Sequence, residues 1–377
     1  MSTVVSYCQS TWEHFEKLRE KMWEESRDWW NKVDQDFNKH SMIDREFRSG
    51  DKVSWIEDWL SNREQRVVIN GTSSDWRSVT SGVPQGSVLG PLLFIIYIND
   101  LDLGLVSKIS KFADDTKMGI NADSEATVKQ LQEDLKRIGE WSEKWQMPFN
   151  LDKCKVMHIG HKNKNEKYEL LGKEINSVQQ EKDLGVIITS DLKSSKQCTE
   201  VVKKAQKLLG YIKRQFRTRK KDTILTLYNS LVRPHLEYAV QFWSPSLRKD
   251  IDRLEAVQAR ATKLIPSIRH LGYKRRLERL NLYLLEKRRL RGQLIETFKI
   301  LKGINNIDYN HLFTFNNNQT RSNGWKLELK KFNTNQCGNF FTYKIVSLWN
   351  KLPAEVVNSV SIDQFKARLD KVIDMLA

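Results

Sequence analysis

Short runs of alternating apolar and polar residues predict strands in the first half of the chain. One such run ends at residue 113, a second extends from 117 to 120, and two aspartates, Asp114 and Asp115, separate them. Runs of this kind bounded by turn residues are typical of paired strands. We therefore expect a strand, a tight turn and a second strand, with both carboxylates at the tip.

Other segments repeat their apolar residues every three or four positions, which is typical of helices that bury one face. We expect an amphipathic helix over 10–39 and a second one that begins at Asp123 or Ser124 and packs on a sheet. The chain should become helical after residue 194, with an end or a kink near Pro234 and a polar, irregular stretch at 305–339. The later predicted helices are 198–216, 223–236, 250–264, 269–303, 340–352 and 362–376.

The aspartate pair by itself has two interpretations. Aspartate is a preferred turn residue, so both side chains could be solvated carboxylates without a chemical role. Carboxylates are also ligands that Mg²⁺ prefers, and this ion usually takes one or two of them together with substrate phosphates. The turn alone does not decide between these alternatives.

Composition favours a polyanionic partner. An excess of Lys and Arg over Asp and Glu gives a net charge of +16 and an isoelectric point of about 9.5, which favours nucleic acid before a membrane surface. The four cysteines lack the spacing of a zinc site or a disulfide framework. The longest apolar run, 91–98, is far shorter than the ~20 residues of a membrane span. We expect an intracellular protein with no membrane partner.

A second stretch, Ser81–Phe94, is a loop rich in Gly and Pro that leads into an apolar helix. Together with Phe112–Thr116 it resembles the palm of reverse transcriptases, specifically the jockey-like enzymes of non-LTR retrotransposons. The resemblance is continuous from Lys52. It implies an α+β right-hand polymerase fold, in which an antiparallel palm sheet with helices is followed by a helical thumb and a C-terminal helical region. The expected units are an amphipathic helix unlike the family (1–51), a partial palm (52–190), the thumb with a basic connection (191–303) and a C-terminal region (304–377).

The resemblance also implies roles for individual residues. Asp114 and Asp115 would bind Mg²⁺ or Mn²⁺, with Asp114 as the bridging ligand. Lys153 would lie near the departing pyrophosphate, although a surface strand lysine is the alternative. The implied nucleotide-binding and template-binding residues are Pro84, Gln85, Gly86, Phe112 and Ala113, and the implied primer grip is Leu184, Gly185 and Val186. The expected partners are an RNA template, a DNA primer or RNA–DNA hybrid, and a deoxynucleoside triphosphate.

The helix expected over 198–216 carries a basic stripe. No acidic residue occurs between Lys203 and Lys221. A solvated helix face is the alternative, but this concentration of positive charge favours contact with the phosphates of a nucleic acid. The residues predicted to make that contact are Lys203, Lys204, Lys207, Lys213, Arg214 and Arg217.

The segment before Lys52 departs from the family. The first palm strand is expected there with a further metal-binding Asp, and only the segment beginning at Asp36 resembles it loosely. We interpret the chain as an N-terminally truncated reverse transcriptase without fingers, and we expect its polymerase activity on its own to be weak or absent. The alternatives are a catalytically inactive, nucleic-acid-binding remnant and a transposon relic that folds poorly.

Overall fold

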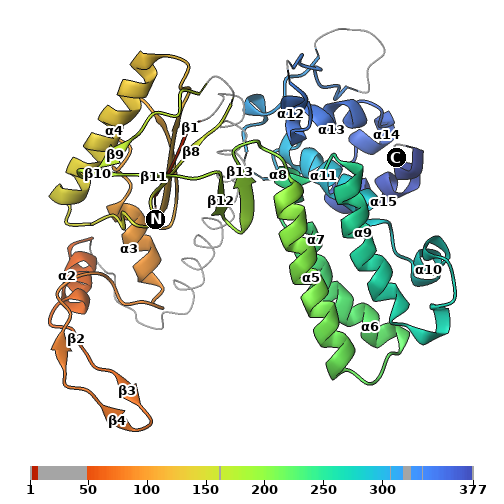
Figure 1. Cartoon of the computed structure of the whole chain (residues 1–377), viewed down its shortest axis with the longest axis horizontal. Helices are drawn as coiled ribbons and strands as arrows, with labels where there is room; N and C mark the ends of the chain where they lie inside the picture. The colour runs from red at the N-terminus through yellow and green to blue at the C-terminus, as the bar shows by residue number, and fades with distance from the viewer. Residues whose placement is uncertain are drawn as a thin grey trace.

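A computed structural model describes most of the chain, and the elements given below belong to that part. The described residues are 2–6, 49–160, 163–305, 307–316, 324–332 and 334–375. The predicted helix over 10–39, together with Asp36, lies outside them. The described part combines helices with small sheets, so the predicted α+β class is confirmed (Figure 1).

Five strands form the largest sheet, in the order β11-β8-β1-β7-β6. β6 and β7 are the two halves of the predicted hairpin and pair antiparallel. β1 lies between β7 and β8 and is parallel to both, and the sequence pattern does not predict this strand. β11 is also parallel to β8, so the expected antiparallel palm sheet is wrong for these strands, of which only β6 and β7 pair antiparallel. The reason is that a strand distant in the sequence lies between the hairpin and β8. The strands are β1 (Ser2–Ser6), β6 (Lys108–Phe112), β7 (Asp115–Ile120), β8 (Lys155–His158) and β11 (Asn176–Ser177).

The core of this sheet lies on the face covered by α4 (Glu125–Lys144). The helix begins where predicted, because the Ser124 side chain accepts a hydrogen bond from the Thr127 backbone N–H at 3.3 Å. Met118 on β7 packs with Leu131 on α4 in one buried cluster. Side chains alternate along a strand, so Lys117 is directed to the opposite face of the sheet from Met118.

A two-stranded ribbon between α2 and α3 projects from the sheet (Figure 1). It turns at Asn70 and Gly71, which have φ values of 49° and 84°, as tight hairpin turns require. All residues from 64 to 78 are exposed. The elements are α2 (Ser49–Leu60), β2 (Glu64–Gln65), β3 (Val68–Ile69), β4 (Thr72–Ser73), β5 (Arg77–Ser78) and α3 (Leu89–Tyr97).

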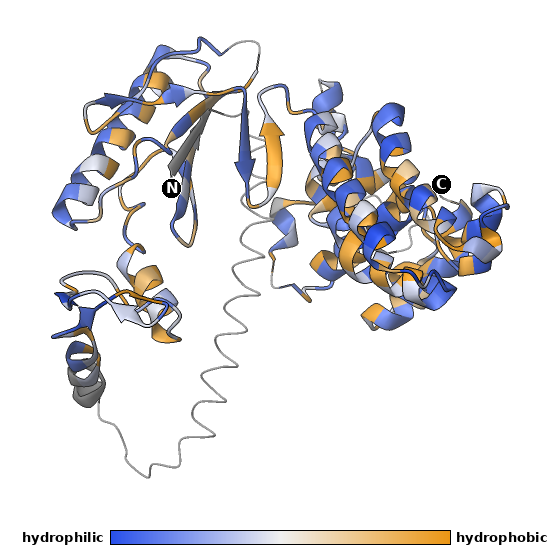
Figure 2. Cartoon of the chain, turned by 60° about the horizontal axis from the view of Figure 1, so that its bottom comes forward, coloured by the Kyte–Doolittle hydropathy of each residue, from blue (hydrophilic) through white to orange (hydrophobic). Residues whose placement is uncertain are grey.

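Two more hairpins follow β8. β12 (Gln180–Asp183) and β13 (Val186–Thr189) pair antiparallel, and the residues implied as the primer grip, Leu184 to Val186, lie at the turn of this hairpin. β12 is polar and β13 is apolar (Figure 2), and the buried Val186 joins the core of the helices that follow. The other hairpin is formed by β9 (Glu169–Leu170) and β10 (Lys173–Glu174).

A bundle of helices around a second core follows the β12–β13 hairpin. The predicted helix over 223–236 is broken into three pieces, because Pro234 has no N–H for a helical hydrogen bond and a π-helical turn, Tyr228–Val232, precedes it. The continuous helix predicted over 269–303 is wrong, since Asn281 adopts a left-handed conformation (φ 51°) and ends the first of two helices. The helices are α5 (Ser195–Gln215), α6 (Lys221–Leu227), α7 (Arg233–Glu237), α8 (Val240–Trp243), α9 (Arg248–Lys263), α10 (Tyr273–Leu280) and α11 (Leu285–Leu301).

A third core joins α11 to the C-terminal helices. Phe298 on α11 stacks on Phe365 with ring centroids 4.3 Å apart. This core therefore includes residues on both sides of the boundary expected between 303 and 304. The closing helices are α12 (Asn335–Gly338), α13 (Phe341–Trp349), α14 (Ala354–Val357) and α15 (Ile362–Val372). None of the helices that the structure describes combines the length and apolar character of a membrane span.

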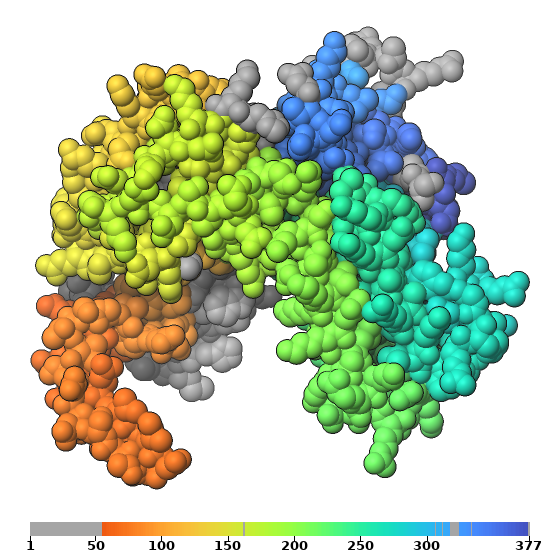
Figure 3. All heavy atoms as spheres, in the orientation of Figure 1, coloured from red at the N-terminus to blue at the C-terminus, as the bar shows by residue number. Residues whose placement is uncertain are grey.

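In the surface view, the ribbon and the α5–α6 end of the bundle form two separate projections that extend in the same direction (Figure 3). The sheet and the β12–β13 hairpin lie between these two projections, and the C-terminal helices lie at the end of the bundle opposite α6, away from the ribbon (Figures 1 and 3). The β12–β13 hairpin is therefore the point where the sheet and the bundle meet.

Candidate functional site

The aspartate turn is a two-residue connection between β6 and β7. Phe112 pairs with Asp115 across the ladder, which leaves Ala113 and Asp114 as the turn. Ala113 has a φ of 49°, a left-handed conformation that alanine rarely adopts. Asp114 is exposed and Asp115 is half-buried. The two adjacent carboxylates thus have different environments, one in the turn and one on the first residue of a strand.

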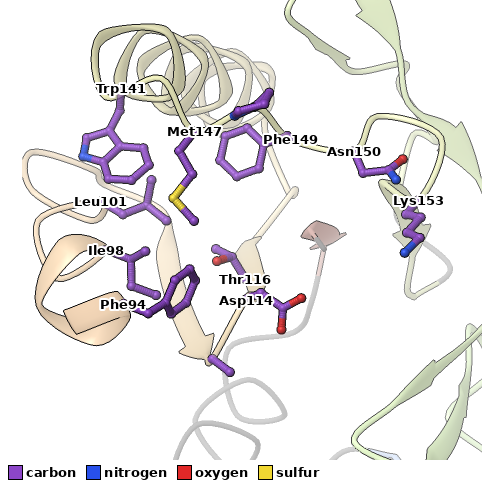
Figure 4. A pocket seen from close by; sticks show the side chains of 12 residues that line it. Phe94, Ile98, Leu101, Asp114, Thr116, Trp141, Met147, Phe149, Asn150 and Lys153 are labelled. Atoms are coloured by element: carbon purple, nitrogen blue, oxygen red, sulfur yellow. The ribbon is translucent and has the colours of Figure 1, made fainter. Parts of the chain in front are cut away.

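Asp114 opens onto a pocket of about 230 Å³ between the turn, α3 and the end of α4 (Figure 4). Aromatic and aliphatic side chains line one side of this pocket, and Asp114, Thr116, Asn150 and Lys153 supply polar groups. The lining residues are Phe94, Ile98, Leu101, Ala113, Asp114, Thr116, Trp141, Met147, Pro148, Phe149, Asn150 and Lys153.

Lys153 reaches this pocket from the turn between α4 and β8. Its backbone N–H donates to the Asn150 carbonyl at 3.0 Å, and both residues line the pocket with Asp114. The structure therefore brings together Asp114, Ala113 and Lys153 from the predicted site. Phe112 belongs to the adjoining strand and does not line the pocket.

The Gly-rich loop lies at the other end of α3. Pro84, Gln85 and Gly86 precede the helix, whereas the α3 residue Phe94 lines the pocket. Pro84, Gln85 and Gly86 are absent from the lining of the Asp114 pocket. The roles implied for these loop residues in nucleotide and template binding stay predictions.

Side-chain hydrogen bonds hold the shape of this loop. The Arg63 guanidinium donates to the Gly82 carbonyl at 2.5 Å. The Ser87 hydroxyl donates to the Pro84 carbonyl at 2.8 Å and accepts from the Gly90 N–H at 3.0 Å. Helix α3 starts two residues after Ser87, and this hydroxyl satisfies one of the N–H groups that a helix start leaves without a partner.

Asp114 and Asp115 supply hard oxygen atoms, which suit Mg²⁺ or Mn²⁺. Among the described residues, no three His, Cys, Asp or Glu side chains gather as a complete metal site. The neighbouring strand β1 has the sequence Ser-Thr-Val-Val-Ser, and its Ser2 pairs with Thr116. The donor set at the turn therefore fits an ion that takes its remaining ligands from substrate phosphates and water.

The tip of the β12–β13 hairpin is formed by Leu184 and Gly185, with φ values of 44° and 85°. The Tyr238 hydroxyl donates to the Leu184 carbonyl at 2.9 Å. On the other side, Lys117 of β7 forms an ion pair with Asp183, the last residue of β12. The sequence pattern reveals neither the Tyr238 hydrogen bond nor the Lys117 ion pair. Alternation along β7 gives the face on which Lys117 lies, but it does not give the partner of Lys117.

The predicted basic stripe lies along α5 and the residues that follow it. Its six residues are all exposed, and Lys203 is paired with Glu200 at 2.9 Å. Burial and the positive charge of Lys204 lower the pKa of the nearby His235. The stripe is therefore a concentration of positive charge on the surface of the helix bundle.

Comparison with known proteins identifies what the chain is similar to. Residues 27–212 match the family described as Reverse transcriptase (RNA-dependent DNA polymerase), a range that begins upstream of Lys52 and ends inside α5. A probable RNA-directed DNA polymerase from transposon X-element of Drosophila melanogaster is 26% identical over 220 residues, which cover 56% of this chain and 24% of the relative.

Two RNA-directed DNA polymerases from the mobile element jockey are also similar. The protein of Drosophila melanogaster is 25% identical over 223 residues and that of Drosophila funebris 27% identical over 224, in each case over 56% of this chain and 24% of the relative. The chain thus spans about a quarter of the length of these relatives.

Proposed function

The chain belongs to the reverse transcriptases of non-LTR retrotransposons, and from this premise we propose that it extends a DNA primer on an RNA template. Its substrates would be the template, the primer or an RNA–DNA hybrid, and deoxynucleoside triphosphates. The observation that carries the proposal is that Asp114 and Lys153, from two separate turns of the chain, line one open pocket.

We assign the five-stranded sheet with α3 and α4 to the palm and the helices from α5 to α11 to the thumb. The order of elements supports this assignment, because a hairpin with paired aspartates is followed by a helix, a strand, two further hairpins and then a helix bundle. The β12–β13 hairpin would be the primer grip, and its place between sheet and bundle suits that role.

In the proposed reaction the primer 3′ oxygen forms a bond to the α-phosphorus of the triphosphate, and the bond from this phosphorus to the leaving pyrophosphate breaks. Asp114 and Asp115 would hold Mg²⁺ or Mn²⁺, which, when bound, neutralises negative charge on the attacking and leaving oxygens. Lys153 would stabilise the pyrophosphate or donate a proton to it. The tip at Leu184–Val186 would hold the primer end.

A second candidate function is nucleic-acid binding without nucleotidyl transfer. The exposed basic stripe on α5 favours it, because these side chains can contact phosphates whether or not the aspartate turn is catalytic. A hybrid duplex would then be recognised mainly through its backbone and its A-form shape.

Primer extension on an RNA template with Mg²⁺ or Mn²⁺ tests the proposal. We expect Asp114→Asn to reduce the rate by about two to three orders of magnitude, the equivalent of a few kcal/mol in the transition state. Asp123→Asn, at an exposed aspartate beyond β7, is the matched control and should keep the rate. Binding that neither variant changes, without any extension by the unmodified chain, would favour the second candidate.

A further inference from the structure

A buried ion pair connects β7, the strand that follows the aspartate turn, to the β12–β13 hairpin. Lys117 lies on β7 two residues after Asp115, and Asp183 is the last residue of β12 before the hairpin tip. Their side chains are only 11% and 12% exposed. Attraction between opposite charges is stronger where water is excluded than at the surface, so this pair resists separation more than the exposed ion pairs of the chain.

The ion pair joins two separate sheets. β7 belongs to the five-stranded sheet, whereas β12 is hydrogen-bonded to β13 alone among the described strands. The base of the hairpin is held by a small apolar cluster that includes Met157 and Ile188. That cluster includes none of the tip residues, and the Lys117–Asp183 pair holds the end of β12 beside the tip against the sheet.

The helix bundle holds the same tip from the opposite side. The Tyr238 hydroxyl donates to the Leu184 carbonyl at 2.9 Å, and a Cβ added to Gly185 would lie 3.4 Å from the Tyr238 ring. Tyr238 directly follows Glu237, and the Glu237 carboxylate accepts hydrogen bonds from Nε and Nη2 of Arg288. The tip is therefore held by β7 through the Lys117–Asp183 pair and by the helix bundle through Tyr238.

We propose that Lys117 is a positioning residue whose ion pair with Asp183 sets the distance between the Asp114–Asp115 turn and the tip of the β12–β13 hairpin. The inference rests on the proposed function, in which the primer 3′ end lies on that tip and reacts at the turn. The reacting atoms must be aligned closely, and a misplacement of about 1 Å can reduce the rate ~10²-fold. Lys117 itself does not take part in the reaction.

Photo-crosslinking from the primer end tests this inference without requiring catalysis. The probe is a DNA primer that ends in 4-thiothymidine, annealed to an RNA template. In the unmodified chain we expect the crosslink in the peptide that contains residues 183–186. In Lys117→Met the crosslink should weaken or move to another peptide. Lys287→Met removes a lysine that is also 12% exposed and paired with Asp374 far from the turn, so it should leave the crosslink unchanged.

Extension kinetics supply the second readout. Lys117→Met should lower kcat by about 100-fold while the KM for the triphosphate stays within a factor of two, because the nucleotide pocket is left intact. The double variant Lys117→Asp with Asp183→Lys restores a pair of opposite charges and should recover most of the loss. If Lys117→Met does not fold, Asp183→Asn and the double variant decide the question.

The outcomes distinguish the positioning role of Lys117 from the proposed polymerase function. An unchanged crosslink and an unchanged kcat in both Lys117→Met and Asp183→Asn would overturn the positioning role, and so would a primer end that crosslinks outside the hairpin in the unmodified chain. Absence of extension by the unmodified chain contradicts the proposed function alone, since the crosslink still shows whether Lys117 determines where the primer end lies.

Discussion

Gly90, in the first turn of α3, lies close to the Gly-rich loop. A Cβ at this position would lie 2.8 Å from the Ser87 hydroxyl oxygen and 3.1 Å from the Pro84 carbonyl oxygen. Both oxygens are joined by the hydrogen bond that shapes the loop. A side chain as small as a methyl group would therefore displace the loop that precedes α3.

We expect Gly90→Ala to lower the free energy of unfolding by about 1–3 kcal/mol, as overpacking does, although alanine is the better helix former. Gly292→Ala in α11 is the matched control, since nothing lies within 4 Å of its Cβ position, and it should raise stability by about 0.5–1 kcal/mol. Urea unfolding of both variants measures the difference. Equal gains in stability would show that the loop is looser than described.

His158 ends β8 as a buried histidine. Burial lowers its pKa, against the opposing effects of a hydrogen bond with Asn163 and the negative charge of Glu166. The folded chain therefore binds a proton at His158 less readily than the unfolded chain, whose histidine pKa is about 6.5. Stability contributed by the neutral ring is present above that pH and is lost as the pH falls through it.

We expect the free energy of unfolding of the natural chain to fall between pH 7.5 and pH 5.5. In His158→Gln this fall should be smaller, because one of the groups that favour the unfolded state at low pH is gone. His235, whose pKa is lowered in the same direction, still titrates in both chains. Urea unfolding at the two pH values gives the comparison, and identical pH dependences would contradict the role of His158.

At the scale of elements, the two faces of a single helix or strand carry different functions. α5 buries Val202 and Leu209 in the bundle core and exposes its basic stripe. β7 directs Met118 into the core beside α4, while Lys117 reaches Asp183 on the other face. In each case, the alternation of apolar and charged positions determines which side chains remain available for binding.

Lys207 on the exposed face of α5 should contribute directly to nucleic-acid affinity. If it neutralises one phosphate of duplex DNA, Lys207→Ala should reduce the slope of log K against log salt concentration by about 0.9. Lys129→Ala, at an exposed lysine on α4, should leave the slope unchanged. Titration of a fluorescent duplex at several salt concentrations measures both, and an equal change in the two variants would argue against a role specific to α5.

At the scale of the whole molecule, α11 ties the bundle to the C-terminal helices. Leu285 belongs to the bundle core, whereas Leu294 and Phe298 belong to the C-terminal core. Arg291 binds Asp370 on α15 through two hydrogen bonds of 2.5 and 2.9 Å. The C-terminal helices thus cover an apolar face of α11 rather than forming an independent appendage.

Phe365→Ala should therefore destabilise the chain strongly. The ring is fully buried and stacks on both Phe298 and Trp349, and removal of a buried phenylalanine side chain costs about 3–5 kcal/mol. Val360→Ala, at a side chain that is 90% exposed, should change stability by no more than about 0.5 kcal/mol. A small effect of Phe365→Ala on thermal unfolding would mean that this core is not packed as described.

Much of the local structure could be predicted from the sequence because it depends on neighbours along the chain. The turn at Asp114 and the start of α4 at Ser124 follow from turn residues, alternation and a capping residue, whereas the hairpin around Leu184 was implied only by the family resemblance. The same reasoning did not predict the break at Asn281, because no local signal outweighed the helical pattern on both sides of it.

The sequence by itself determined which residues could do chemistry: the aspartate turn, the Gly-rich loop, the lysine after α4 and the basic face of α5. Only the tertiary structure decided which of them meet. It places Lys153 on the pocket of Asp114, leaves Gly86 out of the lining of that pocket, and pairs Lys117 with Asp183. The reason is physical: periodicity fixes the face on which a side chain lies, whereas its partner depends on how distant elements pack around a shared core.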